Sequence, residues 1–490
     1  MAQFRPLVAR LNQNLPLLVI LPALASCVVG PDYRRPAAPT HTAYDLAELP
    51  AQERVDQPGP RYDTGAMPDD WWTLLQCPAL DDIERLALTS NNSLIAAKAT
   101  LRQAEQVVLV SRAPYWPQVG LNAGVQRNGA GRFTPTAGGT SSDYFSVGPA
   151  ATYMADLFGA TARAVEQSEA QKQYAHAQLL AADLTVTGAV ASQAIALAGA
   201  RLQISAAEEI LAGDRQNLAI VEKLFTVGKA ARGDVLAAQS QWVGDEAQLA
   251  QLRQQLSVAR HALAVLVSRT AVDWAPPDFA IEDFALPSHL PTTVPSALVE
   301  RRPDIEGAEA LLHAASAAIG IAAAQLYPNI SLSAAVTQQS VDASQVFNSV
   351  NRVWSLGAGL TAPVFRGGAL RAQKRAAIEA YQAQLATYEQ TVLTAFGQVA
   401  DSMRALDHDA ELLHDSRDAL DISMSSLAVQ RATYQAGKTS LVQLLIAEKT
   451  YSEARQTFAT AQTQQLEDVV RFFLAMGGGQ PLGVAAAGNT

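Results

Sequence analysis

Residues 94–125 read LIAAKATLRQAEQVVLVSRAPYWPQVGLNAGV, and residues 305–336 read IEGAEALLHAASAAIGIAAAQLYPNISLSAAV. The two stretches align without a gap at an offset of 211 positions, with Pro328 falling on Pro117. Two later pieces repeat as well: MADLFGATARA (154–164) matches APVFRGGALRA (362–372), and FTVGKAARGDVLAAQ (225–239) matches YQAGKTSLVQLLIAE (434–448). A duplication of this length indicates two copies of one structural unit, and therefore a pseudo-symmetric fold.

The overall composition argues against several classes of protein. The chain has 490 residues, of which 49% are hydrophobic and 17% charged, and its formal net charge is −10. Phosphate binding requires a basic surface, so this balance argues against a nucleic-acid partner. After residue 27 no uninterrupted apolar run approaches about 18 residues, which predicts that the mature chain has no transmembrane helix.

The N-terminus has the pattern of a targeting segment. Two arginines precede an apolar run at 15–25 that is too short to span a bilayer, so we interpret residues 1–26 as a signal peptide. The tetrapeptide LASC at 24–27 is similar to a bacterial lipobox, which makes Cys27 the candidate site of a covalent lipid. An ordinary secretory signal with a chance cysteine is the alternative. Val28 follows in place of aspartate, which by similarity to lipoprotein sorting favours the outer membrane.

Each copy is predicted to contain a helix, a strand, a hairpin loop, a second strand, a long helix, a turn and a returning helix. The leading helices are expected over 78–112 and 303–325. Apolar residues then alternate with small or polar ones, the pattern of a half-buried strand. The alternating residues are Val119, Leu121, Ala123 and Val125 in the first copy and Ile330, Leu332, Ala334 and Val336 in the second. Loops rich in glycine and hydroxyl residues are expected at 128–142 and 338–351, before returning strands that start near Phe145 and Trp354.

The predicted strands pose a problem of closure. Strands of about ten residues match the length that crosses an outer membrane when tilted. Four strands cannot close into a barrel, because about eight is the smallest number, and open edges in lipid leave backbone groups unsatisfied. Either the strands form a soluble sheet, or several chains share one barrel.

Two very long helices are predicted, at about 160–227 and 368–436. Neither stretch contains proline, and both are rich in residues that favour helices. At 1.5 Å per residue each helix is about 100 Å long. Such a helix cannot be the core of a compact domain, so the pattern predicts an antiparallel coiled coil or part of a larger tube.

Both long helices end at a glycine followed by a lysine. These pairs are Gly228 with Lys229 and Gly437 with Lys438. Glycine is the usual residue just past a helix end, so both pairs predict tight turns. Shorter helices are expected to return over 233–268 and 440–475.

The sequence contains no pattern typical of an enzyme. It has no nucleophile motif, no phosphate-binding loop and no metal-ligand spacing. His408 and His414 are six positions apart, which does not place them on one helix face, so we interpret them as solvated. With Cys27 lipidated, Cys77 has no disulfide partner and is expected to be a small buried apolar residue. We therefore expect no catalytic residue, no metal and no cofactor other than the lipid on Cys27.

Four features together resemble one known family. They are CVVGPDYRRP (27–36), DDWWTLLQCPALDDIERLALTSNNSL (69–94), LVERRPDIEGAEALLHAASAAIGIAAAQLYPNISL (298–332) and the two glycine turns. In these the chain is similar to the outer-membrane factors, the TolC-like efflux ducts, and specifically to their lipoprotein branch of the OprM/NodT type. The resemblance covers essentially the whole mature chain.

The resemblance implies a mixed α and β fold that is internally duplicated and trimeric. Three chains would form a twelve-stranded outer-membrane β-barrel continued by a twelve-helix periplasmic α-barrel, which resolves the problem of closure. The expected divisions are a signal peptide (1–26), a lipidated N-terminal tail wrapping the tube (27–77), a first repeat (78–285), a second repeat (286–475) and a flexible C-terminal tail (476–490).

The resemblance also implies a function and partners. The protein would be the outer-membrane exit duct of a tripartite efflux pump, a passive channel for small molecules. It would be a homotrimer, lipid-anchored in the outer membrane and extending into the periplasm. Its partners would be a periplasmic adaptor and an inner-membrane transporter, expected to be of the RND type.

In this family the glycine turns lie at the periplasmic tip, so the four turn residues named above would contact the adaptor. The residues that follow would form the closed aperture, where relatives often carry an acidic ring. Asp234 fits that pattern, whereas Gln443 and Ile446 replace the acidic residues of the second copy. We therefore expect a more apolar aperture. The expected aperture residues are Asp234, Val442, Gln443 and Ile446.

Two alternative functions remain open at this stage. A lipid-anchored periplasmic coiled-coil adaptor would explain Cys27 and the long helices, but not four strands placed symmetrically between them. The duct of a type I protein secretion system would share the same fold, although the lipid anchor argues against it. The sequence does not identify the exported substrate.

Overall fold

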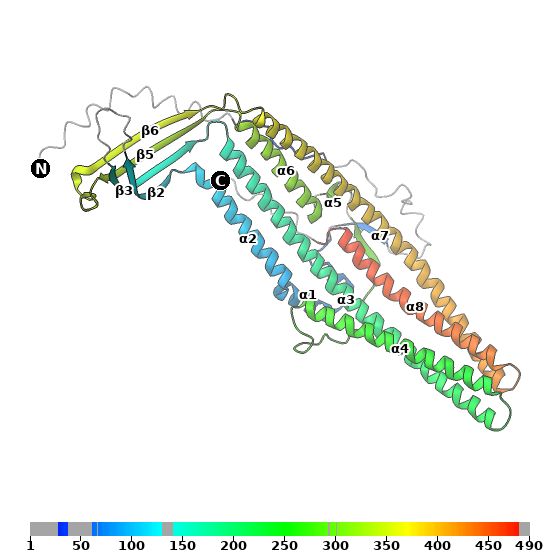
Figure 1. Ribbon diagram of the computed structural model, residues 1–490. Coiled ribbons are helices and arrows are strands. Elements are labelled where there is room, and N and C mark those ends of the chain that lie inside the picture. Colours follow the sequence, from blue (N-terminus) through cyan, green and yellow to red (C-terminus); the bar gives the residue numbers. More distant parts are fainter. Residues whose placement is uncertain are drawn as a thin grey trace. The chain divides into compact units, whose positions relative to one another are not determined.

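The computed structural model describes residues 28–37, 61–65, 67–129, 141–292, 295–299 and 301–479 (Figure 1). The expected signal peptide, Cys27 and the C-terminal residues after 479 lie outside these ranges. The chain forms two compact units, and each takes residues from both repeats. The first unit combines Thr100–Ala175 and Gly307–Tyr388 with the segment 28–36, and the second contains most of the remaining described chain.

The predicted order of elements occurs twice. The first copy contains α2 (Asn92–Arg112), β2 (Gln118–Gly129), β3 (Ser141–Ala155), α3 (Ala160–Thr226) and α4 (Arg232–Leu266). The second contains α6 (Pro303–Ala324), β5 (Asn329–Ser340), β6 (Arg352–Thr361), α7 (Ala369–Gln435) and α8 (Leu441–Ala475). The two long helices both have 67 residues and the two return helices both have 35. These bounds confirm the predicted long helices to within about one residue.

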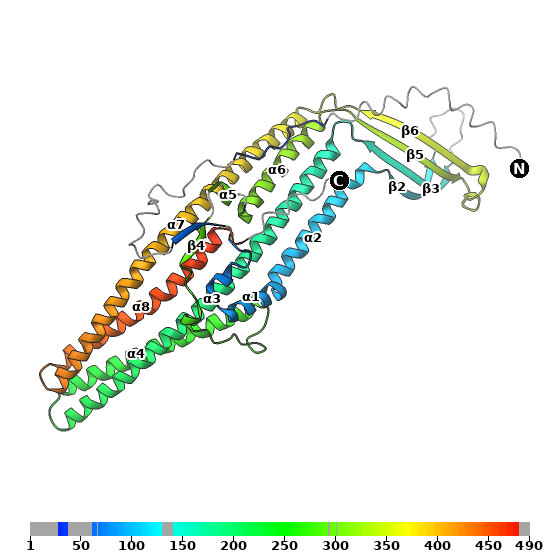
Figure 2. The ribbon, with the colours of Figure 1, turned by 180° about the vertical axis from the view of Figure 1, so that it is seen from behind.

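The return helices form hairpins with the long ones. In both views α4 runs back along the distal part of α3, and α8 runs back along α7 (Figures 1 and 2). These paired segments belong to the second unit. The expected antiparallel pairing of long and short helices is thus present in each copy.

The four predicted strands form one antiparallel sheet in the order β2-β3-β5-β6. The register places Val119 opposite Ala151, Ala151 opposite Ala334, and Ala334 opposite Leu356, so the apolar positions of all four strands lie on one face. Every residue of β2 and of β6 is exposed, including the large apolar ones. The sheet therefore has one apolar and one small or polar face, as the alternation predicted.

The expected continuous helix over 78–112 is wrong, because the chain breaks at Asn91. Residue Asn91 has an extended backbone (φ −63°, ψ 123°), which separates α1 (Pro78–Ser90) from α2. Its side-chain Nδ2 donates to the carbonyl of Leu266 at 2.7 Å, and its Oδ1 accepts the Ser93 N–H at 2.8 Å. The amide therefore caps the new helix and ties the break to the end of α4.

Several short elements were not predicted. Strands β1 (Arg61–Thr64) and β4 (His289–Thr292) pair in parallel, although they are far apart in sequence. The loop expected at 338–351 starts later, because β5 continues to Ser340. The remaining short elements are the 3₁₀ turns η3 (Trp71–Leu75), η4 (Ala113–Tyr115), η5 (Ile281–Asp283), η6 (Ala343–Gln345) and η7 (Ser349–Asn351), and helix α5 (Pro295–Leu298).

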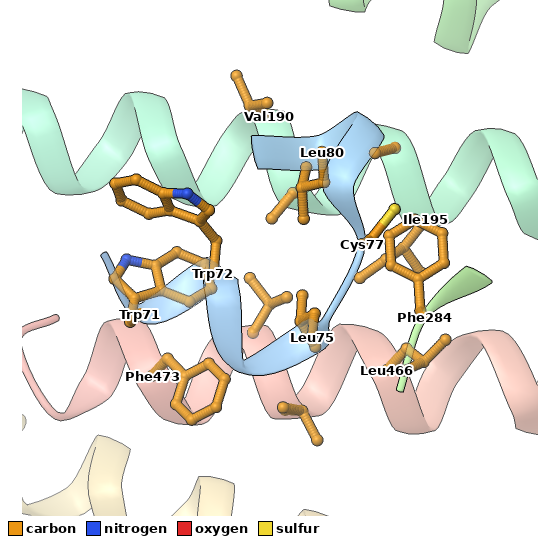
Figure 3. Close-up of a cluster of buried hydrophobic side chains, with 14 of the residues drawn as sticks. Trp71, Trp72, Leu75, Cys77, Leu80, Val190, Ile195, Phe284, Leu466 and Phe473 are labelled. Atoms are coloured by element: carbon orange, nitrogen blue, oxygen red, sulfur yellow. The ribbon is translucent and has the colours of Figure 1, made fainter. Parts of the chain in front are cut away.

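The main apolar core of the second unit gathers around the segment before α1 (Figure 3). Trp71 is 1% exposed and its ring lies 5.4 Å from that of Phe473 on α8. Cys77 is buried there as a free thiol, which confirms the prediction for this residue. Burial raises the pKa of its thiol, so it remains unreactive. Val190 and Ile195 of α3 belong to this core, which joins the N-terminal part of the described chain to helices α3, α4, α7 and α8.

Residues 301–305 link three helices through the side chain of Arg302. Arg302 is 7% exposed and makes a bidentate ion pair with Asp304, at 3.0 and 2.7 Å. It also donates to the carbonyl of Ala475 and to Gln398 Oε1, both at 2.7 Å. One guanidinium therefore connects the start of α6 to α7 and to the end of α8.

Among the residues that the structure describes, two helices, α3 and α6, are long and apolar enough to cross a membrane by length and composition. Their most apolar windows are 39% and 61% buried inside the structure. Neither helix has a long uninterrupted apolar run; their alanine-rich stretches with scattered serine, threonine and glutamine reach a high mean hydropathy instead. Packed core helices pass the same composition test, so these windows by themselves assign no span.

Candidate functional site: the hairpin tips

Both long helices end in the same capping motif. At the first tip Gly228 donates to Phe225 O at 3.0 Å and Lys229 donates to Leu224 O at 2.7 Å. At the second, Gly437 donates to Tyr434 O and Lys438 to Thr433 O, both at 2.9 Å. This is the Schellman pattern, and it needs a left-handed residue, which the glycines supply with φ of +72° and +69°. All four predicted turn residues are exposed.

The residues that follow the turns start the return helices. Asp234 is half-buried, and its Oδ2 accepts the Ala231 N–H at 2.8 Å, which caps α4. In the second copy Ser440 caps α8 and accepts the Gln443 N–H. The Thr439 hydroxyl donates to Gln443 Oε1. The two polar aperture candidates therefore also have structural roles that the sequence did not reveal.

Val442 and Ile446 lie on one exposed face of α8, four positions apart, and each is 60% exposed. Gly437 lies 209 positions after Gly228, and the same offset pairs these two residues with Gly233 and Ala237. A branched apolar face in one copy thus corresponds to a face of small residues in the other. The contrast that the sequence indicated, Asp234 against Gln443 and Ile446, concerns the same turns of the two return helices.

Beneath these exposed residues an apolar cluster joins the two hairpins; we call it the tip cluster. It takes buried residues from all four helices, and Tyr434 packs against it. Burial and the Asp234 carboxylate both raise the pKa of the Tyr434 hydroxyl, so these two groups interact. Tyr434 was not among the residues predicted from sequence, although its position just before the second glycine turn could have indicated it. The buried members are Val221, Val235, Ala238, Leu427, Leu441, Leu444 and Ala447.

A second layer of contacts lies farther from the turns and is polar. We call it the polar layer and define it as Asp214 and Asn217 on α3, Asp245 on α4, Arg431 on α7 and Glu448 on α8. The Asn217 Nδ2 donates to Glu448 Oε2 at 2.6 Å, and Arg431 Nη2 donates to Glu448 Oε1 at 3.3 Å. Residues from all four helices thus meet in one place.

Burial raises the pKa values of two carboxyl groups in this layer, those of Asp214 and Glu448. Burial, a hydrogen bond to the Asp245 carboxyl and the charges of Asp245 and Glu448 raise the pKa of Asp214 to about 8, against the opposing effect of Arg431. Burial also raises the pKa of Glu448, although Arg431 and Asn217 oppose the shift. The layer therefore favours the protonated form of Asp214 at neutral pH.

Comparison with known proteins identifies the family. The family model for outer membrane efflux proteins matches residues 84–269 and 294–478, one segment in each repeat. The chain belongs to the outer membrane efflux protein family. It is 29% identical over 418 residues to the pyoverdine export protein OpmQ of Pseudomonas aeruginosa, covering 84% of this chain and 87% of that protein. It is also 29% identical to the cation efflux protein CusC of Escherichia coli, covering 95% and 98%.

Solved channels share the fold. The outer-membrane channel OprN superposes with a TM-score of 0.84 at 28% identity, over 92% of this chain and 99% of that one. The Campylobacter jejuni CmeC channel superposes with a TM-score of 0.85 over 92% and 95%, and at 20% identity it supports the fold alone. The resemblance inferred from sequence motifs is thereby confirmed.

Family membership establishes what the protein does. It is an outer-membrane efflux channel, a transport duct and not an enzyme. As in its relatives, it is the outer-membrane exit duct of an efflux pump with an adaptor and an inner-membrane transporter. The alternative of a periplasmic coiled-coil adaptor is therefore set aside.

Proposed function

We propose that three copies of the chain close a twelve-stranded barrel in the outer membrane, continued by a tube of twelve helices. The observation that carries this proposal is the sheet itself. Within the described residues its outer strands, β2 and β6, have no paired neighbour, while its apolar face runs across all four strands. Unpaired edges in lipid are too costly to persist. Pairing β6 of one copy with β2 of the next removes every edge.

Migration on a denaturing gel tests the trimer. We expect outer-membrane fractions to contain a band of trimer size that becomes a monomer only on heating. A matched disruption replaces Leu356 of β6 by proline, because a proline within a strand removes a backbone N–H donor and weakens strand pairing. The same substitution at Val272, an exposed loop residue, is the control. A monomeric protein in the membrane fraction would contradict the proposed barrel.

We propose that the glycine turns bind the periplasmic adaptor and that the pump's transporter is of the RND type. The turns are exposed, rigidly capped and carry one lysine each, at positions 229 and 438. A photo-crosslinker at either position should capture an adaptor protein, whereas one at Lys172, far from the turns in sequence, should not. Co-purification of a protein exporter in place of an RND transporter would instead assign protein secretion.

We propose that Asp234, Val442, Gln443 and Ile446, which follow the two glycine turns, line the aperture.

We propose that Cys27 carries the lipid anchor. The docked segment that begins at Val28 supports a fixed anchor point, because Cys27 is only one residue away. Metabolic labelling with radioactive palmitate should mark the wild type and the Cys77→Ala control. Loss of label in Cys27→Ala is expected, and retained label would refute the assignment.

A further inference from the structure

The polar layer connects the two hairpins of one chain at a single carboxylate. Glu448 on α8 is 6% exposed and accepts a hydrogen bond from Asn217 on α3. Within its own hairpin it pairs with Arg431, whose side chain is 47% exposed. The tip cluster is the neighbouring apolar contact between the same four helices. Separating the hairpins would therefore break this link, together with the ion pair between Arg455 on α8 and Glu209 on α3, and expose the tip cluster.

The protonation state of Asp214 sets the negative charge close to the Asn217–Glu448 hydrogen bond. It is 5% exposed, and its Oδ2 is buried without a hydrogen-bond donor. Its carboxyl group faces that of Asp245, which in turn accepts the Gln241 amide at 2.8 Å. A protonated Asp214 can donate a hydrogen bond, whereas its ionised form leaves a buried negative charge without a donor.

The charge balance depends on that proton. With all groups ionised, three buried or half-buried carboxylates face one arginine, and the charge of Asp214 acts directly on Glu448 across the interface. Two other arginines on the same helices have partners outside this site: Arg455 pairs with Glu209, and Arg215 lies over the Trp242 ring. They leave Arg431 as the cation that offsets this site.

We propose that the polar layer is a proton-dependent latch between the hairpins α3–α4 and α7–α8. While Asp214 is protonated, the hairpins stay packed through the Asn217–Glu448 bond. Loss of the proton places a second negative charge beside Glu448 and drives α8 away from α3. Because we assign the aperture to the tips, the latch then holds the duct narrower at acidic than at alkaline pH; this last step rests on the proposed function.

The chain contains its own control for this idea. Asp409 on α7 and Asp468 on α8 form a second buried carboxyl pair, with Gln464 donating to Asp409 at 3.0 Å. Burial and the Asp468 carboxyl raise the pKa of Asp409 to about 7. The pair has the same chemistry but lies within one hairpin. Its ionisation should leave the contact between hairpins unchanged.

Thiol labelling of the tip cluster tests the latch without reference to transport. Ala238 is 3% exposed in the cluster, so Ala238→Cys reports when the hairpins part. The ionised fraction of a group with a pKa of about 8 rises roughly tenfold between pH 7 and pH 9. We expect a similar rise in labelling rate, after normalisation to an exposed Lys229→Cys protein. Native Cys77, buried in another core, stays unlabelled unless the whole protein unfolds.

The discriminating variants are matched substitutions. Asp214→Asn and Glu448→Gln should each abolish the pH-dependent rise, whereas Asp409→Asn should leave it intact. Persistence of the rise in Asp214→Asn, or its loss in Asp409→Asn, would overturn the latch. Trimer migration on a gel verifies that each variant folds.

Single-channel conductance separates the latch from its role in transport. The wild type should conduct more at pH 9 than at pH 7, and Asp214→Asn should conduct at the low level throughout. If labelling follows the prediction but conductance does not change, the latch stands and the assignment of the aperture to the tips is wrong.

Discussion

Gly30 and Gly320 meet backbone to backbone: a Cβ on Gly30 would lie 2.5 Å from the Cα of Gly320. Gly30 also has a φ of +107°, which favours glycine. Beside this contact the Val29 N–H donates to Phe158 O at 3.2 Å, and the Tyr33 ring stacks on His313 at 4.3 Å. The segment that follows the expected lipid site is therefore docked against α3 and α6 within the first unit.

Gly320→Ala should destabilise this docking. The new Cβ would lie 2.7 Å from Arg163 Cγ, and the arginine cannot move freely because it is ion-paired on both sides. We expect a loss of about 1–3 kcal/mol, measured by thermal unfolding. Gly244→Ala is the control: its Cβ meets open space in α4, so it should stabilise by up to about 1 kcal/mol. Equal effects of the two variants would contradict the close contact.

The two ion pairs of Arg163 should contribute unequally to the stability of the folded protein. The side chain of Arg163 is 5% exposed and bonds Asp32 at 2.7 Å and Glu166 at 2.6 Å. Arg163→Leu leaves the half-buried Glu166 with only its contact to His313 Nε2, at 3.0 Å, so we expect a loss of about 1–3 kcal/mol. Asp32→Asn should change the unfolding temperature little, because the Asp32 side chain is 90% exposed. A larger effect at Asp32 would refute this order.

Glu84 should make the protein less stable as the pH rises. It is 0% exposed, and both its carboxylate oxygens lack hydrogen-bond donors. Burial, and secondarily Asp81, raise its pKa to about 9. The folded state thus retains a proton that the unfolded state loses above about pH 4.3, so stability declines between pH 4.3 and pH 9.

Glu84→Gln removes this proton linkage and should flatten the decline. Thermal unfolding followed by tryptophan fluorescence across pH 5–9 measures it, with an expected gain of several degrees at pH 9 relative to the wild type. Exposed Glu246 provides the control, since Glu246→Gln should retain the wild-type slope. An unchanged slope in Glu84→Gln would show that this carboxyl is not neutral in the folded protein.

The exposed apolar face of α8 should restrict the duct. Val442→Ser with Ile446→Ser removes two branched side chains that are each 60% exposed, so folding should be little affected. We expect a higher single-channel conductance in planar bilayers. The matched control Val258→Ser removes an exposed valine from α4, well away from the turn in sequence. No change in conductance would exclude an apolar aperture.

Asp234→Asn should separate the charge of this residue from its capping role. Asparagine can still accept the Ala231 N–H, so α4 should remain capped and the unfolding temperature nearly unchanged. Cation preference, measured as a reversal potential in a salt gradient, should fall. Asp234→Ala should lose both properties, with about 1 kcal/mol of stability. Unaltered preference in Asp234→Asn would remove this residue from the aperture.

Local patterns were enough to predict much of this fold. The long helices were predictable because residues 160–227 contain no proline and mostly strong helix formers, and their ends because Gly228 and Gly437 allow the left-handed conformation that a Schellman turn requires. The strand faces followed from strict alternation. The branched residues Val442 and Ile446 also indicated, by residue type alone, where the two copies differ.

Features that depend on distant partners required the tertiary structure. Asn91 breaks a helix because its amide bonds Leu266 O, 175 positions away in sequence. Strands β1 and β4 are four residues long, too short for any periodic pattern. Asp214 and Glu448 are ordinary polar residues of long helices until packing buries them together. Helix, strand and turn preferences act over a few residues, whereas burial and charge coupling arise only when separate helices meet.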